Sequence, residues 1–373
     1  MALAPFVIRW PGQLVFGDGV FATLGREAAA LGRRALLIVP HGSGLAERAA
    51  HLLEEGDLDV ERFDLIGSEA TIDAVDEAAA MARKAGCDLL VAIGGGEVID
   101  LAKGAAVAAT HDGDIRDYAA GGKPIGATAL AVLAVPTVAG AGAEVAMTAI
   151  LVDRDAQRRV VLRSPHLFPR TALVDPELTH NLSGRATVMA GFDVLARGLQ
   201  AFLCANHANP VTDALALEAI GRAAANLPRV LEKLDDRDAR AQMSMAAVLA
   251  GIAAAGVDAL PAGPSETLAL SRLLPAAIEA WWPKHPDRYA AAARRLAAAP
   301  SDAPVEQQAA ALGPWLRRFV EAVGLDKLWK RRMDAAFGES ITDDTFAGSP
   351  GLDERQIKAM LDRTLGDRSQ EKP

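Results

Sequence analysis

The first half of the chain alternates short apolar runs with stretches in which apolar residues recur every three or four positions. Four runs rich in Val, Ile, Leu and Ala predict buried strands at 35–39, 89–93, 130–135 and 172–174. Between them, 43–55 and 73–85 have the spacing of amphipathic helices. Repeated strand–helix–strand units favour a parallel, doubly wound sheet, whose ligands bind beyond the carboxyl ends of the strands.

The pattern changes near residue 185, where strand signals stop and long helical periods begin. Helices are predicted over 184–204, 210–226, 236–255, 266–282, 286–299, 304–323 and 354–365. Proline or glycine interrupts the helical period between most of these stretches. The sequence therefore predicts an α/β nucleotide-binding domain over 1–182 and an all-helical domain over 183–373, with ligands expected in the cleft between them.

Composition and charge exclude several classes of function. The 373 residues are 51% hydrophobic and 23% charged, which suits a two-domain globular protein. The net charge of −9 is spread along the chain without a basic block, so nucleic acid is not an expected partner. Arg9 and Pro11 interrupt the short apolar run at the N-terminus, so neither a signal peptide nor a membrane span is expected.

The cysteines point to a reducing compartment. There are two, Cys87 and Cys204, far apart and without the CxxC spacing of a metal or redox site. Cys87 precedes an apolar strand, so we expect a buried apolar residue rather than a nucleophile. A cytoplasmic location is the resulting expectation.

Two glycine-containing loops follow predicted strands. Residues 89–104 pass from an apolar strand through three glycines into a helix expected to begin near Val98. Glycines allow close approach of the backbone, and a helix N-terminus directs N–H groups toward an anion such as a pyrophosphate. An ordinary strand-to-helix turn has the same pattern. The second loop, within 130–144, follows a strand ending at Pro136, and two such loops at neighbouring strand ends favour a nucleotide site.

Five blocks resemble successive signature blocks of iron-containing alcohol dehydrogenases. They are GCDLLVAIGGGEVIDLAKGAA (86–106), VPTVAGAGAEV (135–145), SPHLFPRTALVDPELT (164–179), GFDVLARGLQAF (191–202) and NPVTDALALEAI (209–220). Their order and spacing resemble those of that family, and the resemblance extends over about residues 5–366. It implies NAD(P)-dependent interconversion of alcohols with aldehydes or ketones, a small-molecule substrate, and a homodimer.

The resemblance also implies positions for cofactor binding. These are Gly94, Gly95, Gly96, Glu97, Asp100, Lys103, Thr137, Val138 and Arg159. The glycines would line the pyrophosphate, and Asp100 and Lys103 would lie on the helix that follows. Thr137 would keep a hydroxyl near the nicotinamide end, and Arg159 stands where the family usually has a lysine.

The cofactor loops depart from the family pattern at several positions. Glu97 replaces the family's usual serine and brings a carboxylate close to the expected pyrophosphate. If it points inward, the loss of affinity ranges from several-fold to about a hundredfold; if it points to solvent, the loss is small. Hydroxyls are also missing at Val138, Ala141 and Ala143. Pro40 occupies the position that often holds an aspartate for the adenosine ribose, so the sequence does not separate NAD from NADP.

The resemblance implies a metal site that this sequence does not preserve. The family binds its metal through one aspartate and three histidines, the first two spaced as Asp-x-x-x-His on one helix face. Here that pair is Asp193 and Arg197, and a guanidinium has no lone pair to donate. The third position falls on Asp258 or Gly263, depending on the gap, and the fourth on Glu266.

Three interpretations of these residues remain open. Asp193, Asp258 and Glu266 would together suit a hard metal ion. Alternatively, Arg197 takes over the charge of the metal and pairs with those acids, so no metal is expected; we favour this one, because one fixed cation among three acids removes the need for another. The third interpretation is an ordinary helix pair between Asp193 and Arg197, worth about a few tenths of a kcal/mol.

The favoured function is a metal-independent NAD(P)-linked oxidoreductase acting on a small polar, possibly anionic, carbonyl compound. Arg197 would stabilise the developing alkoxide or clamp a substrate carboxylate, with Asp193, Asp258 and Glu266 as the remaining catalytic candidates. The alternatives are a non-catalytic relative that keeps the fold, and non-redox chemistry in the same cleft.

Overall fold

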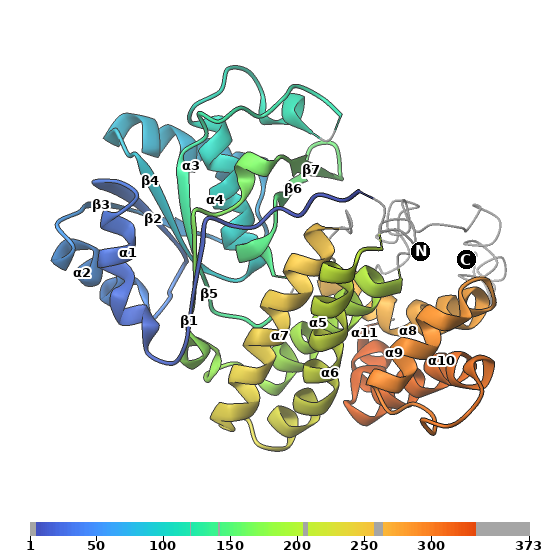
Figure 1. Cartoon of the computed structure of the whole chain (residues 1–373). Helices are drawn as coiled ribbons and strands as arrows, with labels where there is room; N and C mark the ends of the chain where they lie inside the picture. Colours follow the sequence, from blue (N-terminus) through green and yellow to red (C-terminus); the bar gives the residue numbers. More distant parts are fainter. Residues whose placement is uncertain (1–4, 120, 141, 204–207, 257–263, 333–373) are drawn as a thin grey trace, which may run out of the picture. The chain divides into compact units, whose positions relative to one another are not determined.

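The computed structural model describes residues 5–119, 121–140, 142–203, 208–256 and 264–332 (Figure 1). Within these ranges, the side chains of 264–266, 269 and 329–332 are not described. The chain divides into two compact units. One is Ile8–Asn181, and the other comprises the described residues from Leu182 onward with those of Met1–Val7.

A six-stranded sheet forms the centre of the first unit, in the order β1–β8–β5–β4–β2–β3. The strands are β1 (Gln13–Phe16), β2 (Arg34–Pro40), β3 (Asp59–Leu65), β4 (Leu89–Gly94), β5 (Ala131–Pro136) and β8 (Thr171–Val174). All neighbouring pairs are parallel. This confirms the predicted parallel α/β fold.

Helices cover both faces of this sheet, which explains the continuous apolar runs in the sequence. Four helices lie in this unit: α1 (Leu24–Ala29), α2 (Ala46–Glu55), α3 (Ile72–Ala85) and α4 (Gly96–Ala108). Leu37 of β2 belongs to a core with residues of α1 and α2, whereas its neighbour Leu36 belongs to a core with residues of α3 and α4. Successive strand residues therefore point into two separate hydrophobic cores.

The winding of the sheet reverses between β2 and β4. From β2 the chain passes through α2 to the edge strand β3, then returns through α3 across β2 to β4 and continues to β5. In open α/β sheets a ligand crevice forms beyond the carboxyl ends of the two strands at which the winding reverses. The loops that follow Pro40 and Gly94 are therefore the expected walls of that crevice.

Four strands lie outside the runs predicted from sequence. They are β1, β3, β6 (Thr148–Asp153) and β7 (Arg158–Arg163). The last two form a separate antiparallel hairpin. Charged residues interrupt the apolar pattern in β3 and β7, because these strands are exposed on one side and edge strands commonly carry charge.

The second unit is helical throughout its described part. Its helices are α5 (Gly184–Leu203), α6 (Pro210–Glu232), α7 (Arg237–Ala255), α8 (Pro264–Trp281), α9 (Pro286–Arg295), α10 (Val305–Ala322) and α11 (Leu325–Arg332). α6 continues past the predicted end at 226, with Pro228 inside it. α9 ends before the predicted 299, since Ala297 has a φ of 50°. The predicted helix 354–365 lies outside the described residues.

None of the helices described in either unit is long and apolar enough to cross a membrane.

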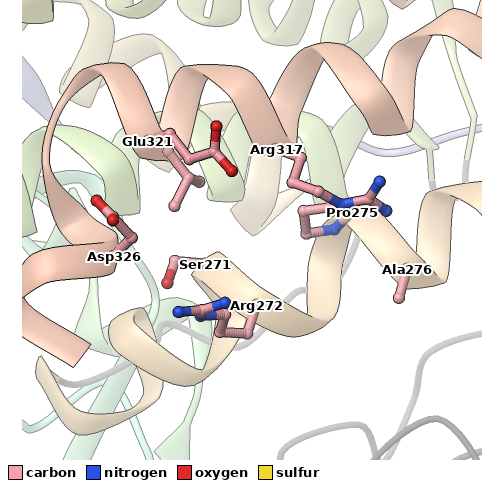
Figure 2. A pocket seen from close by; sticks show the side chains of 8 residues that line it. Ser271, Arg272, Pro275, Ala276, Arg317, Glu321 and Asp326 are labelled. Carbon is pink, nitrogen blue, oxygen red and sulfur yellow. The ribbon is translucent and has the colours of Figure 1, made fainter. Parts of the chain in front are cut away.

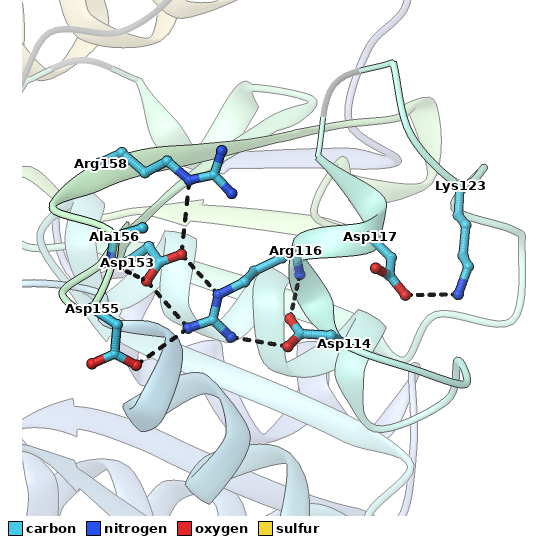
Figure 3. A network of polar contacts seen from close by, with 8 residues as sticks. All are labelled: Asp114, Arg116, Asp117, Lys123, Asp153, Asp155, Ala156 and Arg158. Carbon is cyan, nitrogen blue, oxygen red and sulfur yellow. Dashed lines mark hydrogen bonds and ion pairs between the residues drawn. The ribbon is translucent and has the colours of Figure 1, made fainter.

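An ion-pair network joins the short helical turn Ile115–Tyr118 to the β6–β7 hairpin (Figure 3). Arg116 binds Asp153 through both carboxylate oxygens, with Nε–Oδ2 at 2.7 Å and Nη2–Oδ1 at 3.2 Å. The backbone N–H of Ala156 donates to the same carboxylate at 3.1 Å. These bonds lower the pKa of Asp153 to about 2, with the hydrogen bonds from Arg116 as the largest cause.

We expect Asp153→Asn to lower the melting temperature by a few degrees at pH 7, because it removes the charge that Arg116 faces. The folded pKa of Asp153 lies below its unfolded value near ~3.9. Its stabilising effect is therefore complete above about pH 5 and fades as the pH falls toward about 2. Thermal unfolding at pH 7 and pH 3 should show the difference between variant and wild type narrowing in acid.

Asp155→Asn is the matched control, because Asp155 is exposed and lies 3.9 Å from Arg116. A melting temperature for Asp153→Asn equal to that of the control at pH 7 would show that the network does not stabilise the hairpin.

Candidate functional site

The first glycine-containing loop connects β4 to α4 at the point where the sheet reverses. α4 begins at Gly96, two residues before the predicted Val98, with Gly95 as its N-cap. A Cβ added at Gly94 would lie 2.6 Å from Cγ2 of Val98, whereas one at Gly96 would meet its nearest neighbour, Cβ of Ala143, at 3.8 Å. Gly94 is thus required by packing, and the backbone at Gly96 is approachable.

The second loop lies directly beside the first. Gly94 is in register with Pro136 at the ends of β4 and β5, and the N–H of Thr137 donates to the carbonyl of Gly94 at 2.9 Å. Val138 borders the same loop, because its Cγ2 would lie 3.9 Å from a Cβ on Gly95. The structure therefore brings together six of the predicted cofactor positions: Gly94, Gly95, Gly96, Glu97, Thr137 and Val138.

Glu97 folds back over the glycines. It lies in the first turn of α4, is half-buried, and its Oε2 lies 3.0 Å from the position of a Cβ on Gly95. The partial positive charge of a helix N-terminus favours a carboxylate there. Of the two orientations considered from sequence, this is the inward one, toward the glycines.

Asp100 and Lys103 lie beneath the second loop. Lys103 is fully buried, and its Nζ donates to the carbonyls of Ala143 at 2.6 Å, Ala146 at 2.9 Å and Thr148 at 2.9 Å. Asp100 accepts from the N–H of Ile150 at 3.1 Å. An ammonium has three N–H donors, so Lys103 has none left for a ligand. Both residues hold the 143–150 segment against α4, and their contact with a cofactor stays a prediction.

Two other sequence expectations have clear positions. Arg159 is exposed on β7, opposite Val152 in the hairpin. Cys87 is buried, and burial raises the pKa of its thiol, so the expectation of a buried apolar residue is confirmed.

Asp193 and Arg197 lie one turn apart on α5 and are both buried, at 7% and 2% exposure. The interpretation as an ordinary helix pair between them stays a prediction, but the pair is not at the surface. Arg197 lies where the resemblance implies a histidine ligand, and a guanidinium has no lone pair to donate to iron. Asp258 lies outside the described residues, and of Glu266 only the backbone, in α8, is described.

No group of three or more His, Cys, Asp or Glu side chains in the described part of the chain is arranged to hold a metal ion.

A pocket of about 210 Å³ lies in the helical unit along α8 (Figure 2). Ala276, where the family motif has a further histidine, is one of its lining residues. Its other residues are Ser271, Arg272, Pro275, Arg317, Val320, Glu321 and Asp326. The Oδ1 atom of Asp326 is buried and has no hydrogen-bond partner among the described residues. The lining mixes both signs of charge with apolar surface, which suits a small polar molecule better than a metal ion.

Sequence reasoning missed two polar groups at strand ends. Asp175 follows β8, is 2% exposed, and accepts hydrogen bonds from the N–H groups of Gly19 at 3.1 Å and Phe21 at 2.9 Å. Arg62 and Asp64 lie at the end of β3. The signal for Asp175 was an acid directly after an apolar strand. Arg62 and Asp64 were missed because no strand was predicted at 59–65.

Models of one family match both halves of the chain. The model described as iron-containing alcohol dehydrogenase matches residues 11–176, and the model for the C-terminal part of the Fe-containing alcohol dehydrogenase family matches 187–259. The chain belongs to the iron-containing alcohol dehydrogenase family, and its class is that of an alcohol dehydrogenase-type oxidoreductase.

Several curated relatives are dehydrogenases. Choline dehydrogenase of Bacillus subtilis is 29% identical over 95% of this chain and 93% of the relative. 4-Hydroxybutyrate dehydrogenase of Cupriavidus necator is 40% identical over 63% of this chain and 62% of the relative, and NAD-dependent methanol dehydrogenase of Bacillus methanolicus is 32% identical over 65% and 64%. The match thus spans less than two thirds of the length of these last two relatives.

The fold is also similar to that of a solved alcohol dehydrogenase structure. An archaeal halo-thermophilic alcohol dehydrogenase from a Red Sea brine pool matches with a TM-score of 0.86 and 24% identity, over 98% of this chain and 100% of that one.

We expect Lys103→Met to destabilise the protein by roughly 2–4 kcal/mol, because it keeps the apolar stem but leaves three carbonyls without their donor. Urea unfolding measures the change. Lys84→Met, at an exposed position near the end of α3, should stay within about 0.5 kcal/mol of wild type. Equal stability of the two variants would refute the positioning role.

Proposed function

We propose that this protein is an NAD(P)(H)-linked alcohol dehydrogenase or carbonyl reductase that works without iron on a small polar, anionic substrate. The observation that carries the proposal is the burial of Arg197, at a position where the resemblance implies a metal ligand. Family membership supports an alcohol dehydrogenase-type reaction. The departures from the family's metal-binding motif support a reaction without iron.

The paired glycine loops support binding of the dinucleotide. The approachable backbone of Gly96 and the N-terminus of α4 would form a site for a pyrophosphate at the reversal of the sheet. When bound, the nicotinamide supplies or accepts the hydride. Thr137 is held beside this loop by its hydrogen bond to Gly94, and Lys103 and Asp100 keep the adjoining segment in place.

Arg197 would supply the charge that a metal provides elsewhere in the family. A cation removed from water stabilises a developing alkoxide far more than one in solvent. The same planar group binds a carboxylate through two parallel hydrogen bonds. The relative named 4-hydroxybutyrate dehydrogenase supports the second use, since 4-hydroxybutyrate carries a carboxylate.

One observation favours a second candidate function. The inward carboxylate of Glu97 opposes an anionic cofactor, as expected for a relative that keeps the fold without catalysis. A hard metal held by Asp193, Asp258 and Glu266 is a third possibility within the same family. Homodimer formation, a cytoplasmic location and the absence of metal stay predictions.

The first experiment combines nucleotide binding, metal analysis and variants of Arg197. We expect NADH to bind the purified protein, and we expect the protein to contain less than one equivalent of metal. In Arg197→Met, kcat should fall about a hundredfold or more. Arg197→Lys should recover part of the activity, because it keeps the charge but loses the two-pronged geometry. 4-Hydroxybutyrate and 1-butanol serve as anionic and neutral probes.

Arg185→Met is the control, since Arg185 is exposed on the same helix. Circular dichroism establishes that each variant is folded. Stoichiometric metal in the wild type, or unchanged turnover in folded Arg197→Met, contradicts the metal-free mechanism, and failure of any nucleotide to bind favours the non-catalytic candidate.

We also expect Glu97→Gln to bind NADH about tenfold more tightly, because the amide has the same shape without the opposing charge. The gain should shrink as salt is raised, since the effect is Coulombic. Titration of nicotinamide fluorescence at low and high ionic strength measures it, with Glu77→Gln on the exposed face of α3 as control. Identical NADH affinity in both variants would show that Glu97 does not reach the pyrophosphate.

A further inference from the structure

A polar cluster lies at the carboxyl ends of β2 and β3. Asp64 of β3 is in register with Val39 of β2. Its Oδ1 accepts from Nε of Arg62 at 2.6 Å and its Oδ2 from Nη2 at 3.1 Å. Nδ1 of His41 lies 3.7 Å from Oδ2 of the same carboxylate. Asp64 remains partly open to solvent, with 29% of its side chain exposed.

The sheet places this cluster within reach of a nucleotide held at the glycine loops. The order β4–β2–β3 puts Asp64 two strand spacings, about 10 Å, to the side of β4. A dinucleotide whose pyrophosphate lies at the N-terminus of α4 extends its adenosine half along the strand ends. β2 itself ends at Pro40, which carries no carboxylate for the ribose hydroxyls.

The loop after β2 leaves room for such a ligand. The N–H of His41 donates to the carbonyl of Leu65 at 2.9 Å, which ties the loop to the end of β3. Gly42 has a φ of 74°, and a Cβ added at Gly42 or Gly44 would meet nothing within 4 Å. The loop is therefore anchored at its base and open along its glycines.

We propose that Asp64 accepts the hydroxyls of the adenosine ribose in place of the missing acid of β2, and that it selects NAD(H) over NADP(H). The inference rests on the proposed nucleotide-dependent function and adds to it the residue that sets cofactor specificity.

The charge around Asp64 supports this selection. Arg62 is the side chain that would otherwise bind a 2′-phosphate, but Asp64 holds it through two hydrogen bonds and its Nη1 donates to Glu47 at 2.6 Å. A 2′-phosphate would therefore meet two carboxylates and an already neutralised guanidinium. A 2′-hydroxyl, in contrast, donates to the remaining lone pairs of the Asp64 carboxylate.

The test is Asp64→Asn, which removes the carboxylate and releases Arg62. We expect wild-type protein to favour NADH over NADPH by at least about tenfold in Kd from nicotinamide fluorescence, and the variant to lower that ratio about tenfold or more. Much of the change should be tighter NADPH binding. Adding Arg62→Gln to Asp64→Asn should abolish that gain, because the released guanidinium is its source.

Asp59→Asn is the matched control. Asp59 lies on the same strand at its opposite end and pairs with Arg34 at 2.8 Å, so its loss should leave the NADH to NADPH ratio unchanged. A wild-type preference for NADPH, or a ratio in folded Asp64→Asn equal to that of the control, would overturn this inference while leaving the proposed function intact. Binding of neither nucleotide to the wild type would overturn both.

Discussion

Burial of the six-stranded sheet on both faces is the constraint on which the first unit depends. Apolar residues on successive positions of β2 enter two different cores, so these positions leave no place for polar chemistry within the strand. In the inner strands, polar side chains are therefore confined to the strand ends and the connecting loops. The glycine loop after β4 and the Thr137 loop after β5 are consequences of this confinement, whereas the Asp64 cluster lies on the edge strand β3, which is exposed on one side.

The departures from the family pattern share one theme, which is the redistribution of fixed charge. Arg197 is a cation where the resemblance implies a metal ligand, and Glu97 is an anion where it implies a hydroxyl beside a phosphate. A further anion, Asp64, lies one strand away from the position that lost its acid.

The sequence predicted the architecture well where patterns were strong. The apolar runs of β2, β4, β5 and β8 and the long helical periods after 185 were found within a few residues, and family blocks located both glycine loops. The prediction failed at β3 and β7, because strands exposed on one side carry charges that hide the apolar pattern. It also missed β6, although that strand is apolar and largely buried. Missing β3 also meant missing Asp64, since its importance depends on the register with β2.

The directions of individual side chains could not be predicted from the sequence either. Glu97 was compatible with both an inward and an outward position, and only the distance to Gly95 distinguishes them. Likewise, Lys103 belongs to a cofactor motif, yet burial and three carbonyl partners give it an internal task.

That internal task of Lys103 limits how the first unit can move. Detaching the 143–148 segment from α4 would strand an ammonium in an apolar interior or require water to follow it inward, and both are costly. The 143–148 segment and α4 are therefore expected to move together as one rigid body. Any movement that lets small molecules enter and leave must therefore come from loops other than the 143–148 segment.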